Sequence, residues 1–171
     1  GIWRSYVPPL AKDRIITILG LGTLGTACGI ALERLGFNVR GWSRREKRVD
    51  GILCFYGDDQ IDSSLLDADI VVLLLPDTPL TQNILNQHTL NLLKRGAFVL
   101  NPGRGPLIDD DALLAALETG QIEHATLDVF RIEPLPKNHQ YWSNNKVTVI
   151  PHKASETCLL YTSPSPRDGS E

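Results

Sequence analysis

Three residues with the chemistry to bind an acid and move a proton each follow an apolar run of strand length. They are Arg104, Glu133 and His152, and the runs are Phe98–Asn101, Ala125–Asp128 and Val147–Ile150. Arginine binds a carboxylate through paired hydrogen bonds. Histidine titrates near neutral pH and suits proton transfer, and a nearby carboxylate favours its charged form. Ligands of open α/β sheets bind at the carboxyl ends of strands, so the three side chains should gather at one edge. Singly, each is explained as a surface charge or a turn; the joint pattern favours a site.

A glycine-rich loop lies near the start of the chain, in the sequence Gly20-Leu21-Gly22-Thr23-Leu24-Gly25. It follows a predicted strand and opens a predicted helix, which is the context that a dinucleotide-binding loop requires. The first glycine permits the tight turn, Gly22 lets the backbone approach a pyrophosphate, and Gly25 lets helix and strand pack closely. The N–H groups of Thr23 and Leu24 would then face the phosphates. The alternative is a turn without a ligand.

The end of the second predicted strand indicates which coenzyme would be preferred. NAD-specific sites place an acid there to bind the ribose, but this sequence has Ser43, followed by Arg44 and Arg45. A hydroxyl and guanidinium groups suit a 2′-phosphate. We therefore predict NADP(H), with NAD(H) as the alternative coenzyme. Lys47 and Arg48 follow, so a solvated basic turn is the competing interpretation.

Apolar runs alternate with amphipathic stretches, which predicts βαβ units and an α/β fold: a Rossmann-type doubly wound parallel sheet. The predicted strands are Ile15–Leu19, Asn38–Trp42, Ile70–Leu75, Phe98–Asn101, Ala125–Asp128 and Val147–Ile150. The predicted helices are Thr23–Leu35, Asp58–Leu66, Asn86–Leu93 and Asp109–Thr119. The strands are apolar without alternation, which predicts a sheet covered on both faces.

The composition excludes several classes of protein. Hydrophobic residues make up 42% and charged residues 22% of 171 residues, and the net charge is -3. We therefore expect a globular protein that binds neither nucleic acid nor membrane and lies in the cytoplasm. Cys28, Cys54 and Cys158 fit neither a disulfide framework nor a metal site, and we expect buried free thiols. His88, His124 and His139 are interpreted as structural or surface residues.

Taken together, the motifs resemble the D-isomer-specific 2-hydroxyacid dehydrogenases, and within them the glyoxylate/hydroxypyruvate reductase A type. The likeness runs from about Ile15 to Ser155. It is carried by the glycine loop, the Arg-Gly after a strand, the sequence Asp-Val-Phe-x-x-Glu-Pro from Asp128, and Pro-His at His152.

The resemblance implies NADPH-dependent reduction of glyoxylate or hydroxypyruvate. Arg104 would hold the substrate carboxylate and polarise its carbonyl, His152 would protonate the carbonyl oxygen, and Glu133 would keep His152 protonated. Relatives usually have an uncharged residue where this chain has Lys153, whose charge would oppose that of His152 if it pointed inward. The alternatives are another 2-hydroxy acid, such as D-lactate or phosphoglycerate, or a non-catalytic dinucleotide-sensing module of the same fold.

The resemblance also extends the set of coenzyme-binding residues. Asp128 would hold the nicotinamide carboxamide, Leu75 and Pro76 would flank the adenosine side, and Thr81 would follow on the loop beneath the coenzyme. The strand-end segments contribute further members of the set, namely Pro102, Gly103, Arg104 and His152.

We expect three segments along the chain. Residues 1–14 would be a hinge and remnant of a substrate domain, 15–155 the NAD(P)-binding domain, and 156–171 a disordered tail. The stretch from Cys158 to Asp168 resembles a translated sequencing adapter, so we expect read-through, with an ordinary flexible tail as the alternative. With no methionine and little of a second domain, we expect a fragment that binds coenzyme but holds substrate poorly. The family resemblance further implies a homodimer formed through the coenzyme domain, with residues 107–144 contributing.

Overall fold

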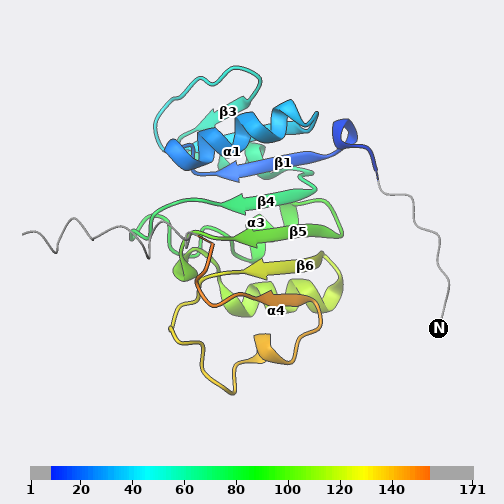
Figure 1. Cartoon of the computed structure of the whole chain (residues 1–171), viewed down its shortest axis with the longest axis vertical. Coiled ribbons are helices and arrows are strands. Elements are labelled where there is room, and N and C mark those ends of the chain that lie inside the picture. Colours follow the sequence, from blue (N-terminus) through cyan, green and yellow to red (C-terminus); the bar gives the residue numbers. More distant parts are fainter. Residues whose placement is uncertain (1–8, 155–171) are drawn as a thin grey trace, which may run out of the picture.

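Short strands rich in valine, isoleucine and leucine form one parallel sheet in the order β3-β2-β1-β4-β5-β6-β7 (Figure 1). The computed structural model describes residues 9–154, and all statements on structure concern that part of the chain. The strands are β1 (Ile15–Leu19), β2 (Asn38–Ser43), β3 (Leu53–Tyr56), β4 (Ile70–Leu73), β5 (Ala97–Asn101), β6 (Ile122–Leu127) and β7 (Val147–Val149). This strand order is that of the doubly wound sheet that the sequence predicted, with β7 added at one edge. Their carboxyl ends lie along one edge, as Figure 1 shows.

Helices cover both faces of the sheet, but unequally. The helix α1 (Thr23–Arg34) packs on one face, over a small cluster that contains Ile16, Ile18 and Val39. The opposite face carries the main core beneath α2 (Ile61–Leu65), α3 (Gln87–Leu92) and α4 (Asp110–Thr119). Short 3-10 turns complete the fold: η1 (Ala11–Asp13), η2 (Asp58–Gln60), η3 (Gly105–Leu107) and η4 (Gln140–Trp142).

Local sequence explains where the helices begin and end. In α3, the side chain of Asn86 accepts hydrogen bonds from the N–H groups of His88 and Thr89. The hydroxyl oxygen of Thr89 accepts in turn from the N–H of Asn86 at 2.8 Å, which completes a capping box. In α4, Asp109 accepts from the N–H of Ala112, and Gly120 ends the helix in the left-handed region at φ 73°. The predicted helices are therefore confirmed, except that residues 58–66 divide into η2 and α2.

The structure differs from the predicted sheet in two places. The strand β3 was not predicted, because it is a short edge strand with β2 as its only neighbour in the sheet, and Leu53 is 60% exposed. The expected cover on both faces fails along β5, where Phe98 and Leu100 are 38% and 36% exposed. These two side chains share the α1 face with Ile70 and Val72, but α1 lies over β1 and β2 and does not reach them. Among residues 9–154, no other helix lies on that face.

The expectations about the two ends of the chain and about its cysteines can be compared with the structure only in part. The adapter-like tail, Cys158 and most of the expected hinge at residues 1–14 lie outside the described residues. Cys28 and Cys54 are free thiols, as expected, but they are half-buried and not buried. Within the described part, no helix has the length and apolar character that a membrane span requires.

The packing of α1 on β1 generates a test of stability. A Cβ on Gly25 would lie 1.9 Å from the carbonyl oxygen of Gly20, a backbone atom that cannot move aside. We expect Gly25→Ala to lower the free energy of unfolding by about 2 kcal/mol or more, because overpacking against rigid backbone costs that much. Urea denaturation measures this change. Gly22→Ala is the matched control, because its Cβ would meet nothing within 4 Å; an equal loss in both variants would contradict the packing argument.

Candidate active site

The glycine loop lies where β1 ends and α1 begins, next to the ends of β2 and β4. Gly20 has φ 116°, its N–H donates to the carbonyl of Trp42 at 2.9 Å, and a Cβ on it would lie 2.6 Å from the carbonyl oxygen of Leu74. Gly22 is the exposed N-cap of α1, with open space where a side chain would project. Thr23 and Leu24 follow as the exposed first residues of the helix. The loop therefore presents the free N–H groups of a helix start without a side chain above them, an arrangement that fits a pyrophosphate.

The end of β2 carries the basic residues beside this loop. Arg44 and Arg45 are exposed, whereas Ser43 is buried and its hydroxyl donates to the carbonyl of Arg45 at 2.7 Å. The ammonium group of Lys47 donates to the carbonyl of Leu21 in the glycine loop. Lys47 thus contacts the glycine loop, two exposed arginines follow the end of β2, and no carboxylate occupies the position of Ser43.

The segments after β4 and β5 line the middle of the edge. Leu75 is buried and Pro76 exposed, and a Cβ on Gly103 would lie 2.7 Å from the carbonyl oxygen of Leu73 at the end of β4. Pro102 is half-buried beside Gly103. The hydroxyl of Thr81 donates to the carbonyl of Pro76 at 2.7 Å, so it closes its own turn. The side chain of Thr81 therefore stabilises the turn of this loop.

Arg104 is held by a turn that Asn101 organises. The side-chain amide of Asn101 donates to the carbonyl of Arg104 at 2.9 Å, and its oxygen accepts from the N–H of Gly103 at 3.1 Å. Asn101 is 1% exposed, so both contacts are shielded from water. The guanidinium of Arg104 is exposed. Sequence analysis did not single out Asn101; the available signal was an asparagine at a strand end before Pro-Gly, which is typical of a side-chain-stabilised turn.

Glu133 and His152 form a direct pair. Nδ1 of His152 lies 2.8 Å from Oε2 of Glu133, and the N–H of Phe130 donates to Oε1 at 2.9 Å. Burial alone would raise the pKa of Glu133, but the hydrogen bonds from His152 and Phe130, with the charges of His152 and Arg104, hold this pKa below its ordinary value. The carboxylate therefore stays ionised at neutral pH and keeps an acceptor directed at the imidazole.

Asp128 fixes the segment that carries His152. Its carboxylate is 3% exposed and accepts from the N–H groups of Lys153 at 2.7 Å and Ala154 at 2.9 Å. Its backbone carbonyl accepts from the N–H of His152 at 2.9 Å, and His152 adopts a positive φ of 53°. The end of β6 thus sets the backbone of the histidine through three hydrogen bonds. This role of Asp128 was not expected, and it is compatible with a further contact to a ligand because carboxylate oxygens accept several hydrogen bonds.

A shallow hollow of about 420 Å³ adjoins the Glu133–His152 pair. Its remaining walls are mostly apolar, from Phe130, Pro134, Leu135, Trp142, Val149 and Pro151. The other histidines lie in structural contacts, as expected: His88 pairs with Asp62, and His124 with Thr148. His139 caps η4. Within residues 9–154 there is no group of three or more His, Cys, Asp or Glu side chains placed to hold a metal ion.

The family model for the NAD-binding domain of D-isomer specific 2-hydroxyacid dehydrogenases matches residues 1–154. The chain belongs to this family. The chain is also 44% identical over 155 residues to glyoxylate/hydroxypyruvate reductase A from Serratia proteamaculans, which covers 91% of this chain and 50% of that protein. The corresponding protein from Yersinia enterocolitica is 40% identical over 156 residues, with the same coverage.

Solved structures of the 2-hydroxyacid dehydrogenase family match the fold closely. A D-isomer specific 2-hydroxyacid dehydrogenase from Xanthobacter autotrophicus Py2, in complex with NADPH and MES, superposes with a TM-score of 0.87 at 44% identity and covers 91% of this chain and 64% of that one. An NADPH-dependent glyoxylate/hydroxypyruvate reductase from Sinorhizobium meliloti, with NADP and sulfate, has a TM-score of 0.87 at 33% identity and covers 94% and 52%. The chain spans about half the length of the curated relatives it matches.

The Glu133–His152 pair generates a prediction on pH. Because the folded state lowers the pKa of Glu133, its contribution to stability is present above the ordinary glutamate pKa and is lost as the pH falls through the folded value. We expect Glu133→Gln to destabilise the chain more at pH 7 than at pH 3, by a small amount because the side chain is 37% exposed. Urea denaturation at both pH values measures the difference.

The control for this measurement is His152→Gln. Because the hydrogen bond from His152 lowers the pKa of Glu133 more than that from Phe130 does, the pH dependence of the Glu133→Gln effect should shrink in that background. A Glu133→Gln effect that is the same at pH 7 and pH 3 would contradict a contribution of the ionised Glu133 carboxylate to stability.

Proposed function

We propose that this chain is the coenzyme domain of an NADPH-dependent reductase of small 2-oxo acids, such as glyoxylate and hydroxypyruvate. The observation that carries the proposal is the Glu133–His152 pair, held at the same sheet edge as a glycine loop with open space at Gly22. A proton donor with an anionic partner, next to a dinucleotide loop, suits transfer of a hydride and a proton to a carbonyl.

Residues at the carboxyl edge of the sheet would have separate roles in such a reduction. A bound reduced nicotinamide supplies the hydride. Arg104, exposed at the end of β5, would bind the substrate carboxylate and draw electron density toward the carbonyl oxygen. His152 pairs with Glu133 through Nδ1, so the proton for the developing alkoxide would come from Nε2. General acid catalysis of this kind contributes about 10²–10⁴-fold to a rate.

The preference for NADPH is supported by the basic residues after β2. A carboxylate in the place of Ser43 would repel a 2′-phosphate. Arg44 and Arg45 are exposed, so their guanidinium groups can approach such a phosphate. Lys47 already contacts the glycine loop. In this proposal the donors to the 2′-phosphate are the guanidinium groups, because the hydroxyl proton of Ser43 is used by the carbonyl of Arg45. The two related structures described above hold NADPH or NADP.

The choice among 2-oxo acids and the assembly rest on resemblance to the family, and the location rests on composition. Because the chain spans half of its relatives, we expect it to bind coenzyme and to hold a 2-oxo acid poorly by itself. Dimerisation through residues 107–144 and a cytoplasmic location belong to the same proposal. NADPH oxidation by a longer form of the protein, with a panel of 2-oxo acids, separates a reductase from a dinucleotide sensor, which would bind NADPH without turnover.

Gly22 gives the sharpest test of the coenzyme site. Gly22→Ala should leave the free energy of unfolding within about 0.5 kcal/mol of the wild type, because its backbone is extended at φ -70° and its Cβ meets nothing. It should weaken NADPH binding by about tenfold or more, because the methyl group would occupy the approach of the pyrophosphate. Titration of NADPH fluorescence measures the affinity. Unchanged affinity in this folded variant would remove the glycine loop from the site.

Arg44 tests the choice of coenzyme. Replacing Arg44 with Asp should weaken NADPH by about tenfold or more while leaving NADH within about twofold, because a carboxylate repels only the 2′-phosphate. Parallel titrations with NADPH and NADH measure the two affinities. Arg48→Asp is the matched control, since Arg48 pairs with Glu46 at the surface. An equal loss for both coenzymes in Arg44→Asp would defeat the 2′-phosphate assignment.

A further inference from the structure

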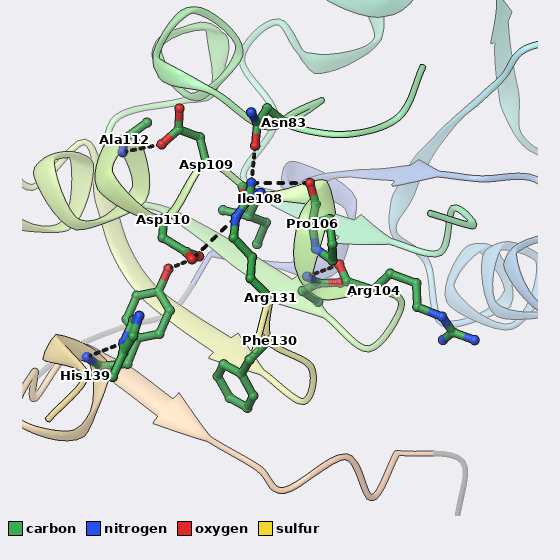
Figure 2. Close-up of polar contacts among 12 residues, drawn as sticks. Asn83, Arg104, Pro106, Ile108, Asp109, Asp110, Ala112, Phe130, Arg131 and His139 are labelled. Carbon is green, nitrogen blue, oxygen red and sulfur yellow. Dashed lines mark hydrogen bonds and ion pairs between the residues drawn. The ribbon is translucent and has the colours of Figure 1, made fainter. Parts of the chain in front are cut away.

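Arg131 lies two residues before Glu133 and is the centre of a network that joins three other segments (Figure 2). Its Nε lies 3.5 Å from Oδ2 of Asp110 in the first turn of α4. Its Nη2 donates to the carbonyl groups of Ile108 and Pro106, the latter at 3.4 Å, and to the side-chain oxygen of Asn83. One guanidinium therefore binds the loop after β4, the turn η3 with the residue that follows it, and the start of α4.

This network connects the turn of Arg104 to the loop of Glu133. Pro106 and Ile108 lie two and four residues after Arg104 in the chain. Gly105, between Arg104 and Pro106, lies against the backbone of Phe130: a Cβ there would be 2.0 Å from the carbonyl carbon of Phe130. Through its hydrogen bonds to Pro106 and Ile108, Arg131 joins the same two segments a few residues further along the chain. Figure 2 shows the side chain of Arg104 pointing away from this network, so Arg131 does not compete with Arg104 for a ligand.

The carboxylate partner of Arg131 is itself held in place. The hydroxyl of Tyr141 donates to Oδ1 of Asp110 at 2.8 Å, and Tyr141 is 2% exposed. Burial and the charge of Asp110 raise the pKa of the Tyr141 phenol, so the hydroxyl remains a donor across the ordinary pH range. The ring of Tyr141 packs against those of His139 and Phe130, with centroids 4.5 and 6.4 Å away. Asp110 therefore offers Arg131 a fixed acceptor.

We propose that Arg131 is a positioning residue that sets the Glu133 loop against the Arg104 turn and so aligns Glu133 with His152. The inference rests on the proposed function, in which Arg104 binds the substrate, His152 donates the proton and Glu133 holds His152. Arg131 makes contact with none of them through its guanidinium; it acts through Pro106, Ile108 and Asp110 on one side and through its own backbone, next to Phe130, on the other. The N–H of Phe130, which donates to Glu133, is the nearest point at which this alignment reaches the site.

A positioning role and a merely stabilising one differ in what they do to Glu133. The charged groups that act on the carboxyl of Glu133 are His152 and Arg104, and a substitution at residue 131 removes neither charge. A loosened loop would lengthen the hydrogen bonds from Phe130 and His152, and the pKa of Glu133 would rise toward its ordinary value. Loss of global stability alone would leave that pKa in the folded molecules unchanged.

The test follows the side-chain carboxyl carbon of Glu133 by NMR through a pH titration of the 171-residue chain. Arg131→Met keeps the aliphatic stem and removes every donor; we expect it to raise the pKa of Glu133 by about half a pH unit. Arg131→Lys keeps the charge but reaches only one acceptor, so it should restore about half of that change. Arg95→Met is the matched control: Arg95 also donates to a backbone carbonyl, that of Thr119, but at the other end of α4. It should leave the pKa of Glu133 unchanged.

Two results would overturn the proposal. In the first, Arg131→Met lowers the melting temperature but leaves the pKa of Glu133 as in the wild type, which makes the residue purely structural. In the second, Arg131→Lys restores the pKa completely, which makes charge and not geometry the cause. If Arg131→Met does not fold, Arg131→Lys and Asp110→Asn carry the test, and an unchanged pKa in both refutes it. Binding of NADPH to the unaltered chain tests the proposed function separately, so the two failures are distinguishable.

Discussion

Close contact of backbone on backbone, at positions where only glycine fits, holds the carboxyl edge of this sheet together. Gly25 brings α1 onto the carbonyl of Gly20, and Gly105 brings the Arg104 turn onto Phe130, the residue whose N–H binds Glu133. A methyl group at either position would lie within about 2 Å of a main-chain atom. The first contact fixes the glycine loop at the start of α1, and the second places the Arg104 turn against Phe130 and so near Glu133. Both depend on the absence of one carbon atom.

The electrostatics of the edge are built on this frame. Buried Asp128 accepts two backbone N–H groups from the segment after His152, and Asn101 makes two hydrogen bonds within the Arg104 turn. Buried polar groups that are fully hydrogen-bonded specify one arrangement, because any other leaves one of them unpaired. Glu133 and Arg104, in contrast, are exposed, so their side chains remain accessible to a ligand. The edge thus combines a rigid backbone with accessible charged side chains.

Sequence alone predicted the elements and motifs that depend on neighbours in the chain. Six of the strands, the helices and the glycine loop follow from apolar runs, helical spacing and glycine spacing, all local signals. The edge strand β3 was missed because its pattern is short and half exposed, and the open face along β5 was missed because an apolar run does not reveal which helices will cover it. Arg131 was missed for a different reason. Its partner Asn83 is 48 residues away, and no spacing in the sequence indicates that the two meet.

The backbone contacts at the strand ends also bear on the function proposed for this chain. The backbone of His152 is tied to β6 through Asp128, its ring to Glu133, and the Arg104 turn to Asn101, all within residues 9–154. The backbone segments that carry Arg104, Glu133 and His152 are therefore fixed by contacts within residues 9–154. Such preorganisation lowers the cost of reaching the transition state, since little has to move when substrate arrives. In the proposed function, the remainder of the protein then has to deliver a 2-oxo acid to an already ordered edge and exclude water from it, but not to build the catalytic geometry.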